Sequence, residues 1–436
     1  MRDVQIAEVY ECIDKSLDLF DRTYSSAAPG LGGWYHRLEA TVPGPSATSV
    51  ALHSYLLVNR IPARLTESLA FLKFRQVISS DALITGGWPV NTSAGRPVLE
   101  ATSLVVRLLG SGHLMMGSGA PDAALGYKWI VTNQNPDGGW GSFLDQPSRV
   151  WLTAMALRAL VEMNLNDISV ASGVEWLLRA RDPQSLAWGE QPNGPATVTH
   201  TSFVLTCLVE SRIGGHHPYV VEAIRKGFEW LHGHLDTSVL HDSARVESYN
   251  VSYVDGERTS TWQNSVWHPS LPYALAALVR HPNGGDPALI AAAVQRIVSS
   301  QSSDGRWTNA DGAAGISVWS VWPYLDALSD FVQKTPIRGT DRVTWLPTNS
   351  ILIRRNGDRS ISVARLAWRF SSARLRALLQ RYWATLLLLL TLLAGVVLTL
   401  LKILEAQEFL FALALPITLV AIQELLARSR PSSRGQ

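Results

Sequence analysis

Asn135-Pro136-Asp137-Gly138-Gly139-Trp140-Gly141 is the stretch of sequence that decides the fold. Weaker copies of its Gly-Trp turn recur along the chain at Trp34, Trp88, Trp188 and Trp307. The first four of these five tryptophans follow one another at intervals of 54, 52 and 48 residues. Regular spacing of this size indicates a repeat protein. The longer interval before Trp307 leaves room for one more unit, which we expect near Trp262 together with an insertion.

Each Gly-Trp turn lies between two helical patterns. Residues 124–134 lead into the turn at Trp140, and residues 151–162, which are apolar almost all round, follow it. A helix that is apolar on every side is buried, whereas a helix with one apolar stripe lies outside. The repeating unit is therefore an outer helix, a turn and an inner helix. Six units predict an all-α (α/α)6 toroid over residues 1–335, with little strand before residue 340.

Two apolar segments at the end of the chain predict a membrane hairpin over residues 383–427. The first segment has 18 residues without a charge, 384–401, which predicts a transmembrane helix over about 384–402. The second carries Pro416 and predicts a span over about 409–427. Seven residues join them, which is enough for a tight turn. Packing of this hairpin with its own copies through Gly395 is a hypothesis for a homo-oligomer.

Positive charge gives the expected orientation of the hairpin. Between Lys334 and Arg381 the chain has eleven Lys or Arg against two Asp, and residues 428–436 form a second basic stretch. Because basic segments stay on the cytoplasmic side, we expect a multi-pass protein of the inner membrane with the toroid and both termini in the cytoplasm. Residues 336–382 are then a basic juxtamembrane linker, with a small β-hairpin expected around Asn356-Gly357. Membrane lipid is an expected partner, and nucleic acid is not.

The sequence of outer helix, Gln134 and Asp-Gly-Gly-Trp-Gly resembles the repeat of squalene–hopene cyclases, class II terpene cyclases and protein prenyltransferase β-subunits. The resemblance covers roughly residues 1–335. It implies an α/α toroid with a cavity that suits an isoprenoid or another lipid-like ligand. Such a likeness of fold does not establish activity.

The catalytic motifs of these families are absent. The acidic motif of class II cyclases has its closest match at residues 197–202, which read Thr-Val-Thr-His-Thr-Ser. None of the three acids of the motif is present there. A histidine of pKa about 6.5 is far too weak an acid to protonate an alkene. Of the zinc ligands of prenyltransferases, only His200 has a counterpart, and a lone histidine does not make a zinc site. Cys12 and Cys207 are too few for a cysteine-rich site, so neither a metal nor another cofactor is expected.

The starts of the inner helices would form a ring at one mouth of the cavity. Aromatic side chains there suit apolar ligands, and helix N-termini favour an anionic group. The residues predicted to bind a ligand are Arg149, Trp151, His200, Trp267, His268 and Trp319. The competing interpretation is that the tryptophans fill a closed core and the histidines are structural.

Residues 240–267 form the longest departure from the repeat. The segment is polar, and both a functional lid and a solvated loop fit it. Its Asp255, together with Glu100 and His200, is a candidate catalytic residue.

Three functions remain open at this point. The first is a membrane-anchored toroid without cyclase or zinc-transferase chemistry that binds a lipid-like ligand or a protein partner, as a sensor or effector does. The second is an enzyme acting on a membrane-derived isoprenoid through Glu100 or Asp255. The third is an interaction scaffold with a filled cavity. Whether the protein is an enzyme is left open by the sequence.

Overall fold

The computed structural model describes thirteen segments of the chain, all within the compact unit Met1–Ile361. They are residues 6–38, 42–58, 60–90, 95–111, 120–163, 168–211, 217–235, 244–255, 258–282, 285–307, 318–334, 342–346 and 350–354. The predicted membrane hairpin 383–427, the tail 428–436 and most of the linker 336–382 lie outside them. Within the described segments, every helix is too short or too polar to cross a bilayer.

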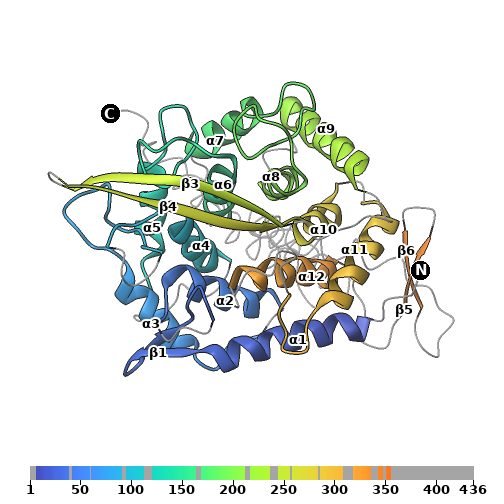
Figure 1. Ribbon diagram of the computed structural model, residues 1–436, viewed down its shortest axis with the longest axis horizontal. Coiled ribbons are helices and arrows are strands. Elements are labelled where there is room, and N and C mark those ends of the chain that lie inside the picture. Colours follow the sequence, from blue (N-terminus) through green and yellow to red (C-terminus); the bar gives the residue numbers. More distant parts are fainter. Residues whose placement is uncertain are drawn as a thin grey trace, which may run out of the picture. The chain divides into compact units, whose positions relative to one another are not determined.

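Outer and inner helices alternate along the chain (Figure 1). The outer helices are α1 (Ile6–Thr23), α3 (Leu65–Arg75), α5 (Ala123–Thr132), α7 (Ile168–Arg179), α9 (Pro218–His234) and α11 (Pro287–Ser300). The inner helices are α2 (Pro45–Leu57), α4 (Leu99–Gly110), α6 (Val150–Glu162), α8 (Val198–Glu210), α10 (Ser270–Arg280) and α12 (Trp322–Lys334), which follows the short 3-10 helix η2 (Val318–Ser320). Each inner helix contacts the next, and α12 contacts α2, so the ring closes. The helical toroid predicted from the repeat is confirmed.

The turn tryptophans join each outer helix to the inner helix that follows it. The indole N–H of Trp140 donates to the carbonyl of Ile130 in the preceding outer helix at 2.8 Å. Its backbone N–H donates to Thr153 Oγ1 in the first turn of the next inner helix at 3.0 Å. Both bonds recur in the turns of the first, second and fourth repeats. Gly138, two residues before Trp140, has a φ of +91°. A Cβ atom at this position would lie 2.8 Å from the Ser172 carbonyl oxygen, so glycine is required.

The fifth unit replaces the Gly-Trp turn with a long β-hairpin. Strands β3 (Ala244–Asp255) and β4 (Arg258–Pro269) pair antiparallel between α9 and α10. The expected turn near Trp262 and the scarcity of strand before residue 340 were therefore wrong, because Trp262 pairs with Val251 inside the ladder. Alternate residues of β3 face the toroid: Glu247 and Val251 are buried, whereas Ser248 and Asn250 are exposed. This period of two is the strand signal, which the polar composition concealed.

Two smaller hairpins complete the described strands. Strands β1 (Ser25–Ala28) and β2 (Leu31–Gly33) pair within the first repeat. Strands β5 (Arg342–Leu346) and β6 (Ser350–Arg354) pair after the toroid. In this ladder Leu346 pairs with Ser350, and the hairpin expected around Asn356-Gly357 lies outside the described residues.

Candidate metal centre

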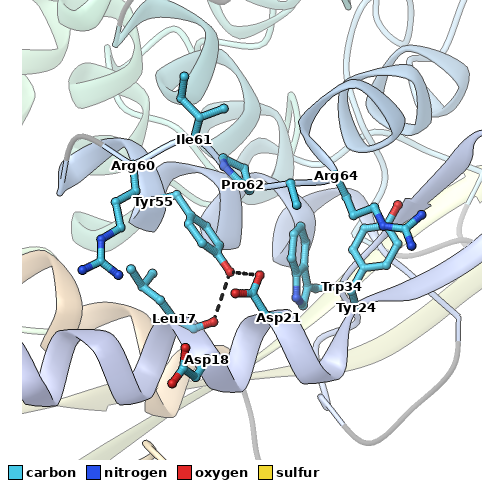
Figure 2. A pocket seen from close by; sticks show the side chains of 11 residues that line it. Leu17, Asp18, Asp21, Tyr24, Trp34, Tyr55, Arg60, Ile61, Pro62 and Arg64 are labelled. Atoms are coloured by element: carbon cyan, nitrogen blue, oxygen red, sulfur yellow. Dashed lines mark hydrogen bonds between the residues drawn. The ribbon is translucent and has the colours of Figure 1, made fainter.

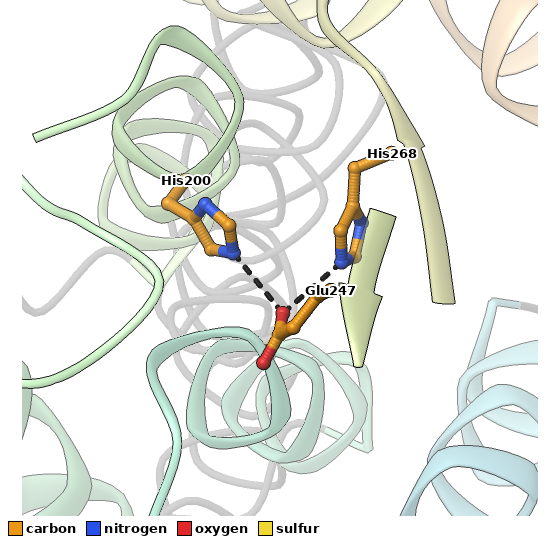
Figure 3. Close-up of side chains that lie close together, drawn as sticks. All are labelled: His200, Glu247 and His268. Atoms are coloured by element: carbon orange, nitrogen blue, oxygen red, sulfur yellow. Dashed lines mark hydrogen bonds and ion pairs between the residues drawn. The ribbon is translucent and has the colours of Figure 1, made fainter. Parts of the chain in front are cut away.

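Glu247 brings two predicted histidines together at the side of the toroid where the inner helices begin. His200 lies in the first turn of α8, His268 lies near the end of β4, and Glu247 lies on β3. The Nε2 atoms of His200 and His268 lie 3.2 and 3.1 Å from the same carboxylate atom, Glu247 Oε2 (Figure 3). The three residues are between 0% and 1% exposed. The cluster is therefore fully enclosed by protein.

Local structure fixes the direction of each side chain. Thr197 is the N-cap of α8, where its Oγ1 accepts from the His200 backbone N–H and lies 2.8 Å from His200 Nδ1. This contact turns Nε2 of the ring toward Glu247. The hairpin is held at its outer half by Gln146, whose Nε2 donates to the Ser252 carbonyl at 3.0 Å. Since side chains of a strand alternate between its faces, the register that buries Val251 also buries Glu247.

Arg149 completes the surroundings of the carboxylate. It is the N-cap residue of α6, and its Nε donates to Glu247 Oε1 at 2.8 Å. Its guanidinium carbon lies 4.1 Å from the ring centroid of Tyr249. Its Nη2 lies 3.9 Å from Glu190 Oε1 and has no hydrogen-bond partner among the described residues. One face and one edge of the guanidinium are thus fixed, and one donor remains available.

Electrostatics favour an ionised Glu247 carboxylate. Burial acts to raise the pKa of Glu247, but the hydrogen bonds from His200 and His268 outweigh it and hold that pKa well below its usual range. Burial lowers the pKa of His268, although Glu247 opposes that shift. Anionic carboxylate and neutral imidazole are the protonation states that bind a metal ion.

The geometry of the cluster fits a transition-metal ion. One ligand atom from each of His200, Glu247 and His268 lies within 4.8 Å of the other two. In a tetrahedral zinc site with bonds of about 2.1 Å, neighbouring ligand atoms are roughly 3.4 Å apart. The observed 3.1 and 3.2 Å are close to that value. The sequence led to the expectation of no metal because only ligands within the repeat were compared. The hairpin supplies two further candidate ligands, Glu247 and His268.

The other predicted site residues lie in different surroundings. Trp151 is buried, stacks on Phe203 at 3.9 Å and meets His268 edge-on at 4.3 Å. Trp319 is also buried, and its indole N–H donates to His36 Nδ1 at 2.8 Å. Trp267 is half-buried on β4. The structure therefore brings Arg149, Trp151, His200 and His268 together, and their contact with a ligand stays a prediction.

Of the two acids proposed as catalytic residues, Glu100 is not part of the cluster. Glu100 is buried in the first turn of α4. The backbone of Asp255 ends β3, and its side chain lies outside the described part of the structure. Glu247, which sequence analysis missed, is the acid at the centre. Its signal was the alternating pattern of β3, in which it lies on the buried face.

The inside of the ring is charged rather than hydrocarbon-like. Side chains from five inner helices form an ion-pair network in which all but Glu210 are buried: Arg107, Arg158, Glu210, Arg280, Asp326 and Asp330. Arg158 donates to Glu210 at 2.9 and 3.2 Å, and Arg280 pairs with the same carboxylate at 2.8 Å. Three cations and three anions are present, so the formal charges of the network cancel.

A pocket of about 560 Å³ lies on another part of the toroid (Figure 2). It lies between α1, the end of α2 and the loop that leads to α3, with Trp34, Tyr55 and Arg60 among its lining residues. Tyr55 donates to Asp21 Oδ1 at 2.6 Å within it. The pocket contains no residue of the His200–Glu247–His268 cluster and none of the predicted ligand-binding residues.

Fold and site together define the protein as an α/α toroid with a buried His–Glu–His cluster at one mouth. No protein-family model matches the chain, and no curated protein matches it. Among solved structures, it is similar to the type II terpene cyclase MstE from Scytonema, with 13% identity, 76% of this chain and 99% of the other covered, and a TM-score of 0.49. A protein from Actinoplanes is 18% identical over 74% of this chain and 99% of its own, with a TM-score of 0.46. Candida albicans protein geranylgeranyltransferase-I, in a complex with GGPP, is 13% identical over 74% and 85%, with a TM-score of 0.39.

These structural neighbours are terpene-cyclase and prenyltransferase folds. MstE has been solved with geranylgeranyl dihydroxybenzoate as substrate. Similarity at this level does not bear on the activity of the present chain. Its centre is therefore interpreted from its own residues.

Proposed function

We propose that this protein binds one divalent transition-metal ion, with zinc the best fit, through His200, Glu247 and His268. The convergence of three buried ligand atoms within 4.8 Å carries this proposal. Two imidazoles and one carboxylate form a ligand set that zinc accepts, and such sets leave a fourth position for water or substrate. Burying these groups has no packing advantage over apolar side chains, so a bound cation explains their presence better than stability does.

The surrounding residues would tune such a centre. Thr197 would hold His200 through its Nδ1 atom, and Arg149 would hold the second oxygen of Glu247. Contacts of this kind orient metal ligands and raise affinity. When bound, the ion would supply Lewis acidity at its fourth position. The protein would supply a dry, shaped enclosure, with Trp151 packed against the ring of His268.

In the proposed function, the protein also binds a lipid-like or isoprenoid ligand and is anchored in a membrane. Support for the ligand comes from the sequence resemblance to isoprenoid enzymes and from Trp151, whose ring packs against His268 of the cluster. Support for the anchor comes from the apolar segments within residues 383–427, with the toroid and both termini in the cytoplasm. Without a suitable Brønsted acid in the cyclase motif, binding or sensing of the ligand is favoured over cyclisation.

The decisive experiment is the metal content of the full chain purified in mild detergent without chelator. Inductively coupled plasma mass spectrometry should find about one zinc-like ion per chain, as one three-ligand site requires. His200→Ala and His268→Ala should each reduce this content well below one. His234→Ala, at an exposed histidine on α9, is the matched control and should leave it unchanged. A wild-type chain that stays metal-free after incubation with zinc contradicts the proposal.

One observation favours a second candidate, the interaction scaffold with a filled interior. Trp151, Phe203 and Tyr273 are almost fully buried and pack on one another inside the ring. In a pure scaffold, His200, Glu247 and His268 would form only a hydrogen-bonded group. Thermal stability would then be the same with zinc and with a chelator.

A further inference from the structure

We infer that the ligand of this centre carries an oxyanion, a carboxylate or a phosphate group. One of its oxygens would take the open metal position, and a second would accept a hydrogen bond from Arg149 Nη2. This inference rests on the proposed metal site and names the chemistry of what binds there.

The first argument is the state of the Arg149 guanidinium. Arg149 is 8% exposed, and its Nη2 is a buried donor without a hydrogen-bond partner among the described residues. A buried donor without an acceptor is energetically unfavourable, because it has lost its hydrogen bonds to water. The side chain cannot easily turn away, because Glu247 holds its Nε and Tyr249 covers its face. A donor fixed in this way is positioned for an acceptor that arrives from outside the protein.

The second argument is the charge balance around the cluster. Together, the two carboxylates of Glu247 and Glu190 and the guanidinium of Arg149 have a net charge of −1. A divalent ion changes the net charge of this group to +1. Helices α6 and α8 also begin here, and the N-cap Arg149 provides no side-chain cap for α6. Helix N-termini carry partial positive charge and favour anions. A ligand with one negative charge would neutralise the loaded centre.

The third argument is the route of access. The side chains of His200, His268 and Glu247 are 0–1% exposed, but those of Arg149 and Glu190 are 10% and 21% exposed. Of these side chains, those of Arg149 and Glu190 are therefore the ones nearest to solvent. At 3.9 Å, Glu190 attracts Arg149 without forming a hydrogen bond with it. Glu190 is thus placed where an incoming anion would bind, and it competes with that anion for Arg149.

Two substitutions with opposite expected effects follow from this arrangement. Arg149→Met removes the donor and its charge, and should weaken anion binding about tenfold, as expected for one lost charge-assisted hydrogen bond. Glu190→Gln removes the competing carboxylate and should strengthen anion binding several-fold, because like charges repel at this range. Arg225→Met, on the exposed face of α9, is the matched control for loss of a guanidinium.

The test uses the full chain in detergent, reconstituted with Co²⁺, whose visible spectrum reports changes at the metal. Sodium acetate and methyl phosphate are titrated separately at constant ionic strength, with chloride as the balancing anion. We expect a saturable spectral change with at least one of the two anions, and which anion produces it identifies the headgroup. Circular dichroism and metal content verify that each variant is folded and loaded, and Arg149→Lys tests the charge without the second donor.

The outcomes separate this inference from the metal site itself. A chain that takes up no Co²⁺ contradicts the proposed function. A loaded chain whose spectrum is unchanged by both anions, or whose anion affinity is the same after Arg149→Met and Glu190→Gln, overturns the oxyanion inference and leaves the metal site standing. Weaker binding in Arg149→Met together with tighter binding in Glu190→Gln supports it.

Discussion

Glu247 Oε2 lies 3.1 Å from His268 Nε2, across the two strands of one hairpin. In the ladder Glu247 pairs with Val266, so His268 is the next residue of β4 on the same face. The hairpin alone thus supplies two of the three candidate ligands, and α8 supplies the third. A metal ion at this point would tie the insertion to the ring of inner helices.

Glu247→Gln should remove most of the metal affinity and also destabilise the fold. Changes even outside the direct ligands cost metal affinity about 10- to 100-fold, so loss of the only anionic ligand should cost at least about 100-fold. The substitution also leaves Arg149 as a buried cation without its carboxylate, which costs about 3–5 kcal/mol. Competition with a fluorescent zinc chelator measures the affinity, and urea unfolding measures the stability. Glu11→Gln, on the exposed face of α1, should change neither.

Removing the metal should lower the melting temperature of the toroid. A ligand that binds only the folded chain adds about 4 kcal/mol when its free concentration is about 1,000 times its dissociation constant. Differential scanning fluorimetry with zinc and with a chelator should therefore give different midpoints for the wild type. For each of the variants His200→Ala and His268→Ala, the midpoint should be the same with zinc and with the chelator. Equal midpoints for the wild type would instead support the scaffold.

The repeat could be predicted from the sequence because its signals are local. In four of the turns the tryptophan contacts the helix before it and a threonine after it, as Trp140 does with Ile130 and Thr153. Such contacts recur at a fixed spacing and can be recognised without knowing the fold. The same alignment of inner-helix starts led to Arg149, His200 and His268, which the structure brings together.

The hairpin could not be predicted in the same way. Its polar strands lie within a segment that has no counterpart in the other repeats, and its register depends on long-range packing against α6 and α8. A shift of the register by one residue would turn Glu247 outward. Glu247 therefore becomes recognisable as a ligand only when the hairpin is seen against the toroid.

Acid should destabilise the toroid through its buried histidines. Burial, assisted by Arg107, lowers the pKa of His53 to about 3. An unfolded chain binds a proton at this histidine below pH of about 6.5, whereas the folded chain stays neutral. Because the unfolded state then binds more protons, stability falls as the pH falls from about 6.5 toward the folded pKa. Stability contributed by neutral His53 is thus complete above pH of about 6.5 and is lost below it.

Replacing this histidine should flatten the pH dependence. Each pH unit below about 6.5 costs about 1.4 kcal/mol per such histidine, so His53→Gln should reduce the stability difference between pH 7 and pH 5 by about 2 kcal/mol. Urea unfolding at the two pH values measures it. His36, whose pKa burial lowers to about 4, gives a second test through His36→Asn. An unchanged pH dependence in both variants would show that these histidines do not cause the acid sensitivity.

Arg158→Met should destabilise the ring far more than loss of an exposed arginine. Arg158 is 4% exposed and forms two hydrogen bonds with Glu210, and its removal leaves the buried network with one excess negative charge. Breaking a buried ion pair on one side costs about 3–5 kcal/mol, whereas an exposed pair contributes about 0–1 kcal/mol. The exposed control Arg225→Met should therefore stay close to wild type in urea unfolding. The double variant Arg158→Met/Glu210→Leu should recover part of the loss, because it removes the unbalanced charge together with its partner. If the double variant is less stable than Arg158→Met by the full cost of a second substitution, the two side chains contribute independently and the network is not an electrostatic unit.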